Sequence, residues 1–262
     1  MLKNTSHNNG VKKIEIIPVS IPSNIKSGDR LDILILKSLE SIQEKLFDND
    51  ILVIAHKVVS KSEGRIKNLE NIKPSPKSLS IGNQIGKDAR VVKLILNESR
   101  DIVRLSKGLL IVETRHGFVC ANAGIDQSNV GYDFNHVVLL PIDADRSARK
   151  IRNSLRKQTG KDIAVVISDT FGRPFREGQT NVAVGVAGIE PIKSYIGTSD
   201  MYGKKLRVTE IAVVDEIASA AELVMGKSER IPVAVIRYYN YNKVEETSIS
   251  ELIRSKEKDI FR

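Results

Sequence analysis

Residues 163–178 read IAVVISDTFGRPFREG, and this stretch decides the fold class. The run from Ile163 to Ile167 is apolar and largely β-branched, which predicts a buried strand. Polar residues follow at once, so we expect Asp169 and Thr170 at the carboxyl end of that strand. Open α/β sheets place their chemistry at this edge. The stretch therefore predicts an α/β protein whose functional edge includes Asp169.

A second polar stretch, NAGIDQSN at residues 122–129, also follows an apolar run. Asp126 and Asp169, brought together with hydroxyl and amide oxygens, would form a hard-oxygen site suited to Mg²⁺ or Mn²⁺. Arg173 and Arg176 follow the second carboxylate, and arginines suit phosphate or carboxylate groups. The two stretches indicate a metal-bound nucleotide as substrate. The alternative is that the aspartates cap helices or turns and the arginines form surface salt bridges.

The remaining apolar segments predict alternating strands and helices. Expected strands are 14–19, 51–55, 109–113, 137–140, 181–188 and 231–237, of which 181–188 is rich in small residues and should pack closely against another backbone. Expected helices are 31–47, 86–97, 146–157 and 213–225. The polar residues 60–80, with two prolines, are expected to form a loop or mobile insertion. We expect a flexible tail at 1–12 and one domain over 13–262, with room for a second lobe around 180–245.

Composition is that of a soluble globular protein, with 41% hydrophobic and 28% charged residues among 262. No apolar stretch reaches the roughly 20 residues that span a bilayer, and residues 1–13 lack the apolar core of a signal peptide. We therefore expect a cytoplasmic protein without a membrane partner. The single cysteine, Cys120, lies in an apolar run and is expected to be a small buried side chain rather than a nucleophile.

The formal charge of +9 favours anionic partners. Most lysines and arginines stand beside acidic residues, as on a solvated helix face. Only residues 146–157 are markedly basic, and the helical spacing of the apolar residues there predicts an outward basic face. The sequence shows neither aromatic interleaving nor a nucleic-acid-binding motif, so nucleic acid is not an expected partner.

Four blocks in order make the sequence recognisable: Lys61 within VSKSEGR at 59–65, the stretch 122–129, the stretch 168–178, and DEIA at 215–218 leading to Met225 and Gly226. Together they resemble the coenzyme F420-0:γ-glutamyl ligase family over about residues 14–260. The resemblance implies an unusual two-part α/β fold, α+β-like, with mixed sheets and flanking helices, assembled as a homodimer. It also implies an enzyme that uses GTP to join L-glutamate to the lactyl carboxylate of coenzyme F420-0, adds a γ-linked glutamate, and releases GDP and phosphate.

The implied chemistry gives roles to the polar residues. A carboxylate becomes an acyl donor once a phosphoryl group is transferred to it, and metal ions held by carboxylates assist that transfer. The resemblance implies two Mg²⁺ or Mn²⁺ ions per site and a K⁺ requirement. Asp126 and Asp169 are the expected metal ligands, and Thr170 is expected at the second metal. Arg173 and Arg176 would hold the anionic precursor or glutamate.

The resemblance also carries over nucleotide contacts. Lys61 suits a polyphosphate as a point charge, although a solvated loop lysine is the alternative. His56 and Lys57 stand where the family often has hydroxyl residues, and His56 could equally be a packed residue at a strand end. Lys227 stands where the family often has an acidic residue, so it either replaces a metal charge or contacts a nucleotide phosphate. The full set is Pro22, Ser23, Asn24, Ile25, His56, Lys57, Lys61, Asn129, Met225, Gly226 and Lys227.

Two other functions remain open at this point. An amide ligase of the same family acting on another carboxylate would keep the nucleotide and metal residues and change only the acceptor pocket. A non-catalytic nucleotide-sensing or nucleic-acid-binding protein would bind GTP or RNA without turnover. The pair of aspartates argues against the second.

Overall fold

The computed structural model describes residues 13–22, 24–127 and 135–260, so the tail 1–12 and the predicted contacts Ser23 and Asn129 lie outside the described residues. Its centre is a five-stranded mixed sheet in which β2 and β8 run parallel and the other neighbours are antiparallel. The strand order is β1 (Glu15–Val19), β12 (Val233–Arg237), β2 (Ile51–Ala55), β8 (Ala164–Arg173) and β9 (Arg176–Ala187). The predicted fold class, mixed sheets with flanking helices, is confirmed.

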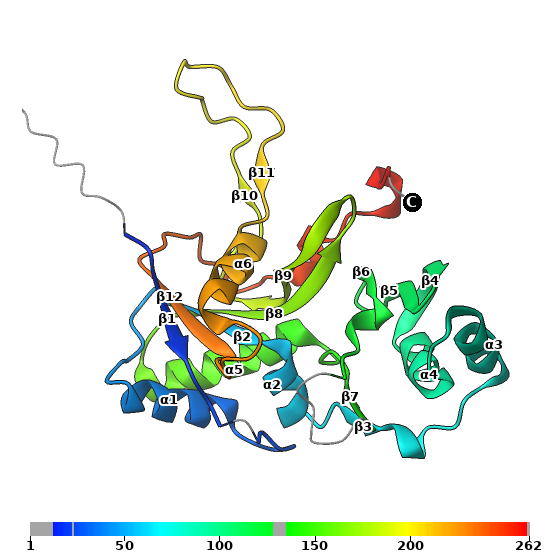
Figure 1. Ribbon diagram of the computed structural model, residues 1–262. Helices are drawn as coiled ribbons and strands as arrows, with labels where there is room; N and C mark the ends of the chain where they lie inside the picture. The colour runs from blue at the N-terminus through cyan, green and yellow to red at the C-terminus, as the bar shows by residue number, and fades with distance from the viewer. Residues whose placement is uncertain (1–12, 23, 128–134, 261–262) are drawn as a thin grey trace, which may run out of the picture.

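Helices cover both faces of this sheet (Figure 1). Helices α1 (Leu31–Ser41) and α5 (Ala144–Thr159) pack on one face, and α6 (Val213–Met225) packs on the other. Because neither face meets water, the central strands are continuously apolar rather than alternating. The short helix α2 (His56–Ser62) follows β2 directly. We call these elements the sheet unit.

A separate satellite unit spans residues 66–138 and has its own apolar core (Figure 1). A three-stranded antiparallel sheet and two helices form most of it. Its elements are β3 (Ile66–Asn68), η1 (Leu69–Asn71), α3 (Pro76–Ile85), α4 (Ala89–Asn97), β4 (Ser99–Ser106), β5 (Leu109–Thr114), β6 (Val119–Ala121), η2 (Asn122–Gly124) and β7 (His136–Val138). Strands β3 and β7 pair at its junction with the sheet unit.

Two segments project from the sheet unit in Figure 1. One is the tip of the β8–β9 hairpin, where Phe175 is exposed. The other is the arm at residues 193–211, which carries the short strands β10 (Lys193–Ser194) and β11 (Glu210–Ile211) and exposes Met201 and Tyr202. The last two elements in the described part of the chain, after α6 and β12, are the short 3₁₀ turns η3 (Ile249–Leu252) and η4 (Lys256–Lys258). Residues 180–245, where the sequence allows a second lobe, contribute to β9 and supply β12 of the central sheet.

The prediction of a loop or mobile insertion at 60–80 is wrong. This segment holds the end of α2, β3, η1 and the start of α3. Ser75 and Ser78 form a capping box and Pro76 occupies the first turn, which are signals for a helix start. Pro76 therefore begins a helix instead of excluding one.

Two helix boundaries also differ from prediction. The helix expected at 31–47 ends at Ser41, because Gln43 adopts a left-handed φ of 59° and turns the chain, which leaves Ile42 exposed. The helix expected at 86–97 begins at Ala89, since Gly86 ends the preceding helix in the left-handed conformation and Asp88 caps the new one. The close backbone contact predicted for 181–188 is confirmed, because a Cβ on Gly185 would lie 2.5 Å from the Ala144 backbone.

In the part of the chain that the structure describes, no helix has both the length and the apolar character required to cross a membrane.

Candidate functional site

Asp169 lies within a strand rather than after one, since β8 continues to Arg173. Its partner β2 ends at Ala55, opposite Ser168, so Asp169 is the first residue beyond the parallel pairing. Asp169 therefore still stands at the carboxyl edge of the parallel pair, where α/β sheets bind ligands. Its Oδ1 accepts a hydrogen bond from the backbone N–H of Thr170 at 2.7 Å, and its side chain is 13% exposed.

The first residue of α2 faces Asp169. His56 is only 1% exposed, and its Nε2 lies 3.3 Å from Asp169 Oδ1, without the alignment of a good hydrogen bond. Its Nδ1 lies 3.4 Å from the Ser60 hydroxyl, one turn along the helix. His56 is therefore packed at the end of a strand, as the sequence allowed, and it packs against the Asp169 carboxylate.

The next residue of α2 faces the other predicted carboxylate. Lys57 Nζ lies 2.6 Å from Asp126 Oδ2, and the Asp126 side chain is 40% exposed. Asp126 belongs to the satellite unit, where its backbone forms an isolated bridge with Val138. Two carboxylates 43 positions apart in sequence thus contact consecutive residues of one helix. The structure brings together the two stretches that the sequence singled out.

An unusual backbone turn leads into Asp126. Asn122, Ala123 and Gly124 all have positive φ values, of 53°, 56° and 68°. Consecutive left-handed residues are costly for residues other than glycine, and such strain concentrates at functional sites. The Asn122 Oδ1 is buried and makes no hydrogen bond with any residue that the structure describes. The turn directs the chain from β6 toward the junction of the two units.

One face of α2 carries two ammonium groups. Lys57 and Lys61 are one turn apart and so lie on the same side of the helix. Burial lowers the pKa of Lys61, and the charge of Lys57 lowers it further. Positive charge is thus concentrated beside Asp126, as a polyphosphate site requires.

The predicted loop Pro22–Ile25 leads to the far end of α2. Gly28 N–H donates to the Ser62 carbonyl at 2.8 Å, which ties the loop after β1 to the end of the helix that carries Lys61. Pro22, Asn24 and Ile25 help to line a shallow hollow of about 410 Å³ in this loop. The structure therefore places the described part of this loop and Lys61 at the same end of α2.

Thr170 faces a different group of residues, on β9 and α6. Its hydroxyl donates to Asn181 Oδ1 at 2.6 Å, and Asn181 Nδ2 donates to Glu222 Oε2 at 2.8 Å. Lys227 Nζ contacts both the Thr170 hydroxyl and Glu222 Oε1, the latter at 3.1 Å. Gly226 ends α6 just before it, whereas the Met225 side chain is buried in the core.

Asn181 and Glu222 were missed by the sequence analysis. Asn181 stands opposite Thr170 in the β8–β9 register, and a polar residue opening an otherwise small and apolar strand was the available signal. Glu222 lies on a helix among ordinary acidic residues and offered no such signal.

Arg173 and Arg176 lie apart from the carboxylates within one chain. They pair with each other at the tip of the β8–β9 hairpin, and Arg173 donates to the Glu177 carbonyl at 2.7 Å. Arg173 is four residues beyond Asp169 along the strand, a span of roughly 13 Å at the usual strand rise. Within one chain, a ligand that contacts both Asp169 and these arginines would extend along the β8–β9 hairpin.

The donor chemistry at the junction suits a hard divalent cation. Asp126 and Asp169 offer carboxylate oxygens, the ligands that Mg²⁺ and Mn²⁺ prefer. Within the described ranges, no group of three or more His, Cys, Asp and Glu residues forms a dedicated metal cage. Two carboxylates completed by substrate phosphates is the usual arrangement for Mg²⁺.

Cys120 is buried, as predicted. Burial, with a smaller contribution from the Asp169 charge, raises the pKa of its thiol to about 12. The thiol is therefore protonated at neutral pH and does not act as a nucleophile.

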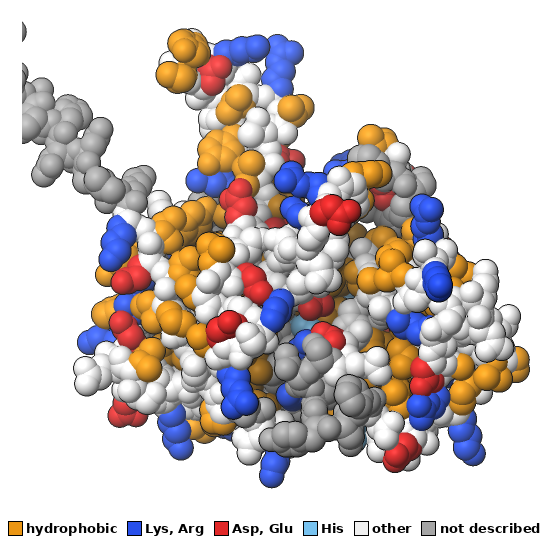
Figure 2. Space-filling view, in the orientation of Figure 1, with side chains coloured by type: hydrophobic (Ala, Val, Ile, Leu, Met, Phe, Trp, Pro, Cys, Tyr) orange, Lys and Arg blue, Asp and Glu red, His pale blue; other side chains and the backbone are white. Residues whose placement is uncertain are grey.

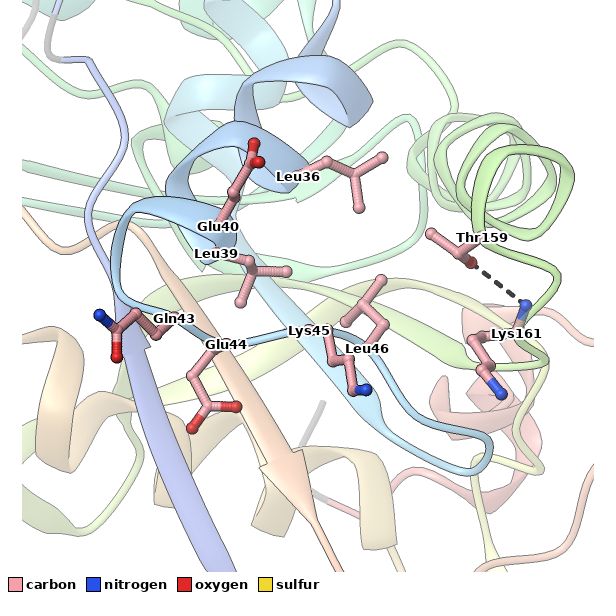
Figure 3. A pocket seen from close by; sticks show the side chains of 9 residues that line it. All are labelled: Leu36, Leu39, Glu40, Gln43, Glu44, Lys45, Leu46, Thr159 and Lys161. Atoms are coloured by element: carbon pink, nitrogen blue, oxygen red, sulfur yellow. Dashed lines mark hydrogen bonds between the residues drawn. The ribbon is translucent and has the colours of Figure 1, made fainter.

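The candidate site and the pocket drawn in Figure 3 are in different parts of the molecule. Figure 2 shows acidic, basic and histidine side chains gathered around a hollow between the two units. A different pocket of about 390 Å³, shown in Figure 3, lies between the end of α1, the 43–46 loop and residues 159–161. The 43–46 loop and residues 159–161 come before β2 and β8 in the chain. The pocket is therefore at the amino ends of these strands, whereas Asp169 is at the carboxyl end of their parallel pairing. None of the predicted site residues lines it.

Comparison with known proteins identifies the family of this chain. Residues 19–238 match the family model described as F420-0:Gamma-glutamyl ligase, so the chain belongs to that family. It is 48% identical to the coenzyme F420:L-glutamate ligase of Methanothermobacter thermautotrophicus over 95% of this chain and 99% of that protein. It is 43% identical to the protein of the same name from Methanopyrus kandleri, over 97% and 99% of the two chains. The Methanocaldococcus jannaschii protein of that name is 41% identical over 96% and 98%.

Proposed function

We propose that this protein is a GTP-dependent ligase that joins L-glutamate to the lactyl carboxylate of coenzyme F420-0 and then adds a γ-linked glutamate. The observation that carries the proposal is that Asp126 and Asp169 contact consecutive residues at the start of α2, in a chain of this family. The names of the relatives, each a coenzyme F420:L-glutamate ligase, support the choice of acceptor and amino acid.

The reaction needs an activated carboxylate, because oxide is not a leaving group. In the first step a carboxylate oxygen of the acceptor attacks the γ-phosphorus of GTP, and the bond from that phosphorus to the bridging oxygen breaks. GDP leaves and an acyl phosphate forms. In the second step the glutamate amine attacks the acyl carbon, loses a proton to solvent, and expels phosphate as the amide forms.

The chain's residues favour the first step by holding charge in place. Mg²⁺ or Mn²⁺ held by Asp126 and Asp169 would neutralise the charge that builds on the transferred phosphate oxygens. Lys57 and Lys61 would hold the nucleotide phosphates along one face of α2, and the loop at its far end would contact the nucleoside. The Thr170 N–H donates to Asp169 Oδ1 and buried His56 packs against the same oxygen, so Asp169 Oδ2 would be the oxygen for the ligand. A K⁺ requirement belongs to the same proposal.

The projecting hairpin favours a homodimer. Arg173 and Arg176 are at its tip, away from the carboxylates of their own chain, so they would reach the anionic acceptor or glutamate bound to a second copy. Light scattering of the purified protein should give a mass near twice 29.0 kDa. A monomer with full activity would refute this part of the proposal.

Mass spectrometry tests the function directly. F420-0, L-glutamate, Mn²⁺ and GTP are incubated with the protein, and the products are scored for one and two added glutamates while GDP and phosphate are counted. ATP in place of GTP and a panel of other carboxylate acceptors run in parallel. If F420-0 stays unmodified while another carboxylate is ligated, that carboxylate replaces F420-0 as the proposed acceptor. If GTP binds and no product forms, the proposed catalytic activity is refuted.

A further inference from the structure

Lys227 belongs to a set of contacts that also includes Thr170, Asn181 and Glu222. Together these contacts determine which atoms donate hydrogen bonds and which accept them. Glu222 Oε2 can only accept, so the Asn181 group that meets it is the amide nitrogen. Asn181 Oδ1 then faces Thr170 and must accept the hydroxyl proton. The proton of the Thr170 hydroxyl is therefore used in the hydrogen bond to Asn181, and only the lone pairs of its oxygen are available to other groups. Those lone pairs meet the Lys227 ammonium.

The ammonium occupies the place of a cation at this point. Lys227 Nζ meets the Thr170 hydroxyl oxygen on one side and Glu222 Oε1 at 3.1 Å on the other. A hydroxyl lone pair next to a carboxylate oxygen is a pair of donors that also suits Mg²⁺ or Mn²⁺. The sequence resemblance implied a second metal ion at Thr170. Here the oxygen that would bind that ion already binds a fixed positive charge.

The end of α6 shapes this arrangement. Gly226 has φ 58° and ψ −172°, and a Cβ there would lie 2.0 Å from a Glu229 carboxylate oxygen. The turn therefore accepts glycine and places Lys227 as the first residue after it. Glu229 accepts hydrogen bonds from the Ser228 N–H and hydroxyl, so this acidic group is turned onto its own loop.

We infer that the Lys227 ammonium takes the role of the second divalent cation in this chain, which then binds one divalent ion fewer than a chain with an acidic residue at this position. The inference rests on the proposed function only for the first ion, at Asp126 and Asp169. A surface ion pair without further role is the simpler account, because the Lys227 side chain is 62% exposed and such pairs contribute little. That account does not explain why the Thr170 hydroxyl gives its proton to Asn181 and directs its lone pairs toward the ammonium.

Counting bound Mn²⁺ separates the two accounts without using activity. Mn²⁺ is titrated into the full chain, with and without saturating GDP, and the free ion is measured by electron paramagnetic resonance. Lys227→Glu removes the ammonium and adds an oxygen ligand, whereas Lys227→Met removes the ammonium alone. Lys77→Met, at an exposed position of α3 in the satellite unit, makes the same charge change far from the site.

The expected result is one additional Mn²⁺ per chain in Lys227→Glu relative to the unaltered protein under the same nucleotide condition. The extra ion should bind at least roughly tenfold more tightly in Lys227→Glu than in Lys227→Met, because a carboxylate is the stronger ligand. Lys77→Met should match the unaltered protein. Equal numbers of bound ions in the unaltered protein and Lys227→Glu would overturn the inference while leaving the proposed function standing. Absence of bound Mn²⁺ in all four proteins would instead refute the metal site of the proposed function, and this inference with it.

Discussion

The two units of the molecule each supply one carboxylate, but they hold it in different ways. Asp169 lies in a central strand, paired with Val182 across the β8–β9 ladder, and its side chain is largely buried. Asp126 lies on a connection with one isolated backbone bridge, after three left-handed residues, and its side chain is 40% exposed. The sheet therefore fixes the position of Asp169, whereas Asp126 depends on a turn and on its ion pair with Lys57.

The largest effect is expected at the rigid carboxylate. Asp169→Asn keeps an oxygen that can accept from Thr170 N–H, so the fold should remain while the anionic ligand is lost. Turnover at saturating Mn²⁺ should fall at least about a hundredfold, or roughly 3 kcal/mol in the barrier. Asp200→Asn in the projecting arm is the matched control and should leave the rate unchanged. Near-normal turnover by folded Asp169→Asn protein would remove this carboxylate from the mechanism.

Lengthening each carboxylate by one methylene compares the two units directly. Asp169→Glu must fit beside buried His56, so we expect a loss of at least about a hundredfold, because a displacement near 1 Å costs this much in a positioned site. Asp126→Glu is on an exposed connection that can adjust, and we expect a loss of about tenfold or less. Asp126→Asn, which removes the charge, should again lose at least about a hundredfold. Equal losses for the two glutamate variants would contradict the proposed difference in rigidity.

Acid should weaken the sheet unit through Asp32, which joins α1 to α5. Burial opposes its charge, but hydrogen bonds from Arg30, Ser154 and Gln158 lower the pKa of Asp32 to about 2. Because this folded-state pKa is below the unfolded value of about 3.9, the stabilisation is present above that value and is lost as pH falls toward 2. It amounts to about 2 kcal/mol.

Urea unfolding of the unaltered protein and of Asp32→Asn measures this contribution. The difference in unfolding free energy should be about 2 kcal/mol at pH 6 and should shrink toward zero near pH 2. Hydrogen exchange should show the loss in amides of β2 and β8 before those of β5 in the satellite unit. A difference that does not change with pH would show that the Asp32 charge is not its source.

The smallest effect is expected at Lys61, in the last turn of α2. Lys61→Ala should weaken GTP binding by about tenfold, near 1.4 kcal/mol, and leave the KM for glutamate unchanged. Since burial and the neighbouring Lys57 lower the pKa of Lys61, its contribution should fade as pH rises, at a lower pH than for an ordinary lysine. Titration calorimetry across pH measures both, with Lys77→Ala as control. Unchanged GTP affinity would make Lys61 a structural or solvated residue.

The sequence by itself determined the local features of this protein. The apolar run ending at Ile167 determined a buried strand, since a strand covered on both faces needs no polar alternation. The small residues around Gly185 determined close packing against another backbone, because any larger side chain would collide there. The order of four short blocks determined the family, which the comparisons confirmed.

Only the tertiary structure decided which residues meet. Asp126 and Asp169 both contact α2, through Lys57 and His56. This happens because β2 pairs beside β8 and leads into α2, although β2 is distant from both aspartates in sequence. Arg173 and Arg176 were near Asp169 in sequence, yet the hairpin carries them away, since a strand extends about 3.3 Å per residue. Lys227 reached Thr170 because a helix on the other face of the sheet ends there. Contacts between distant segments depend on how the sheet is ordered, which local patterns do not encode.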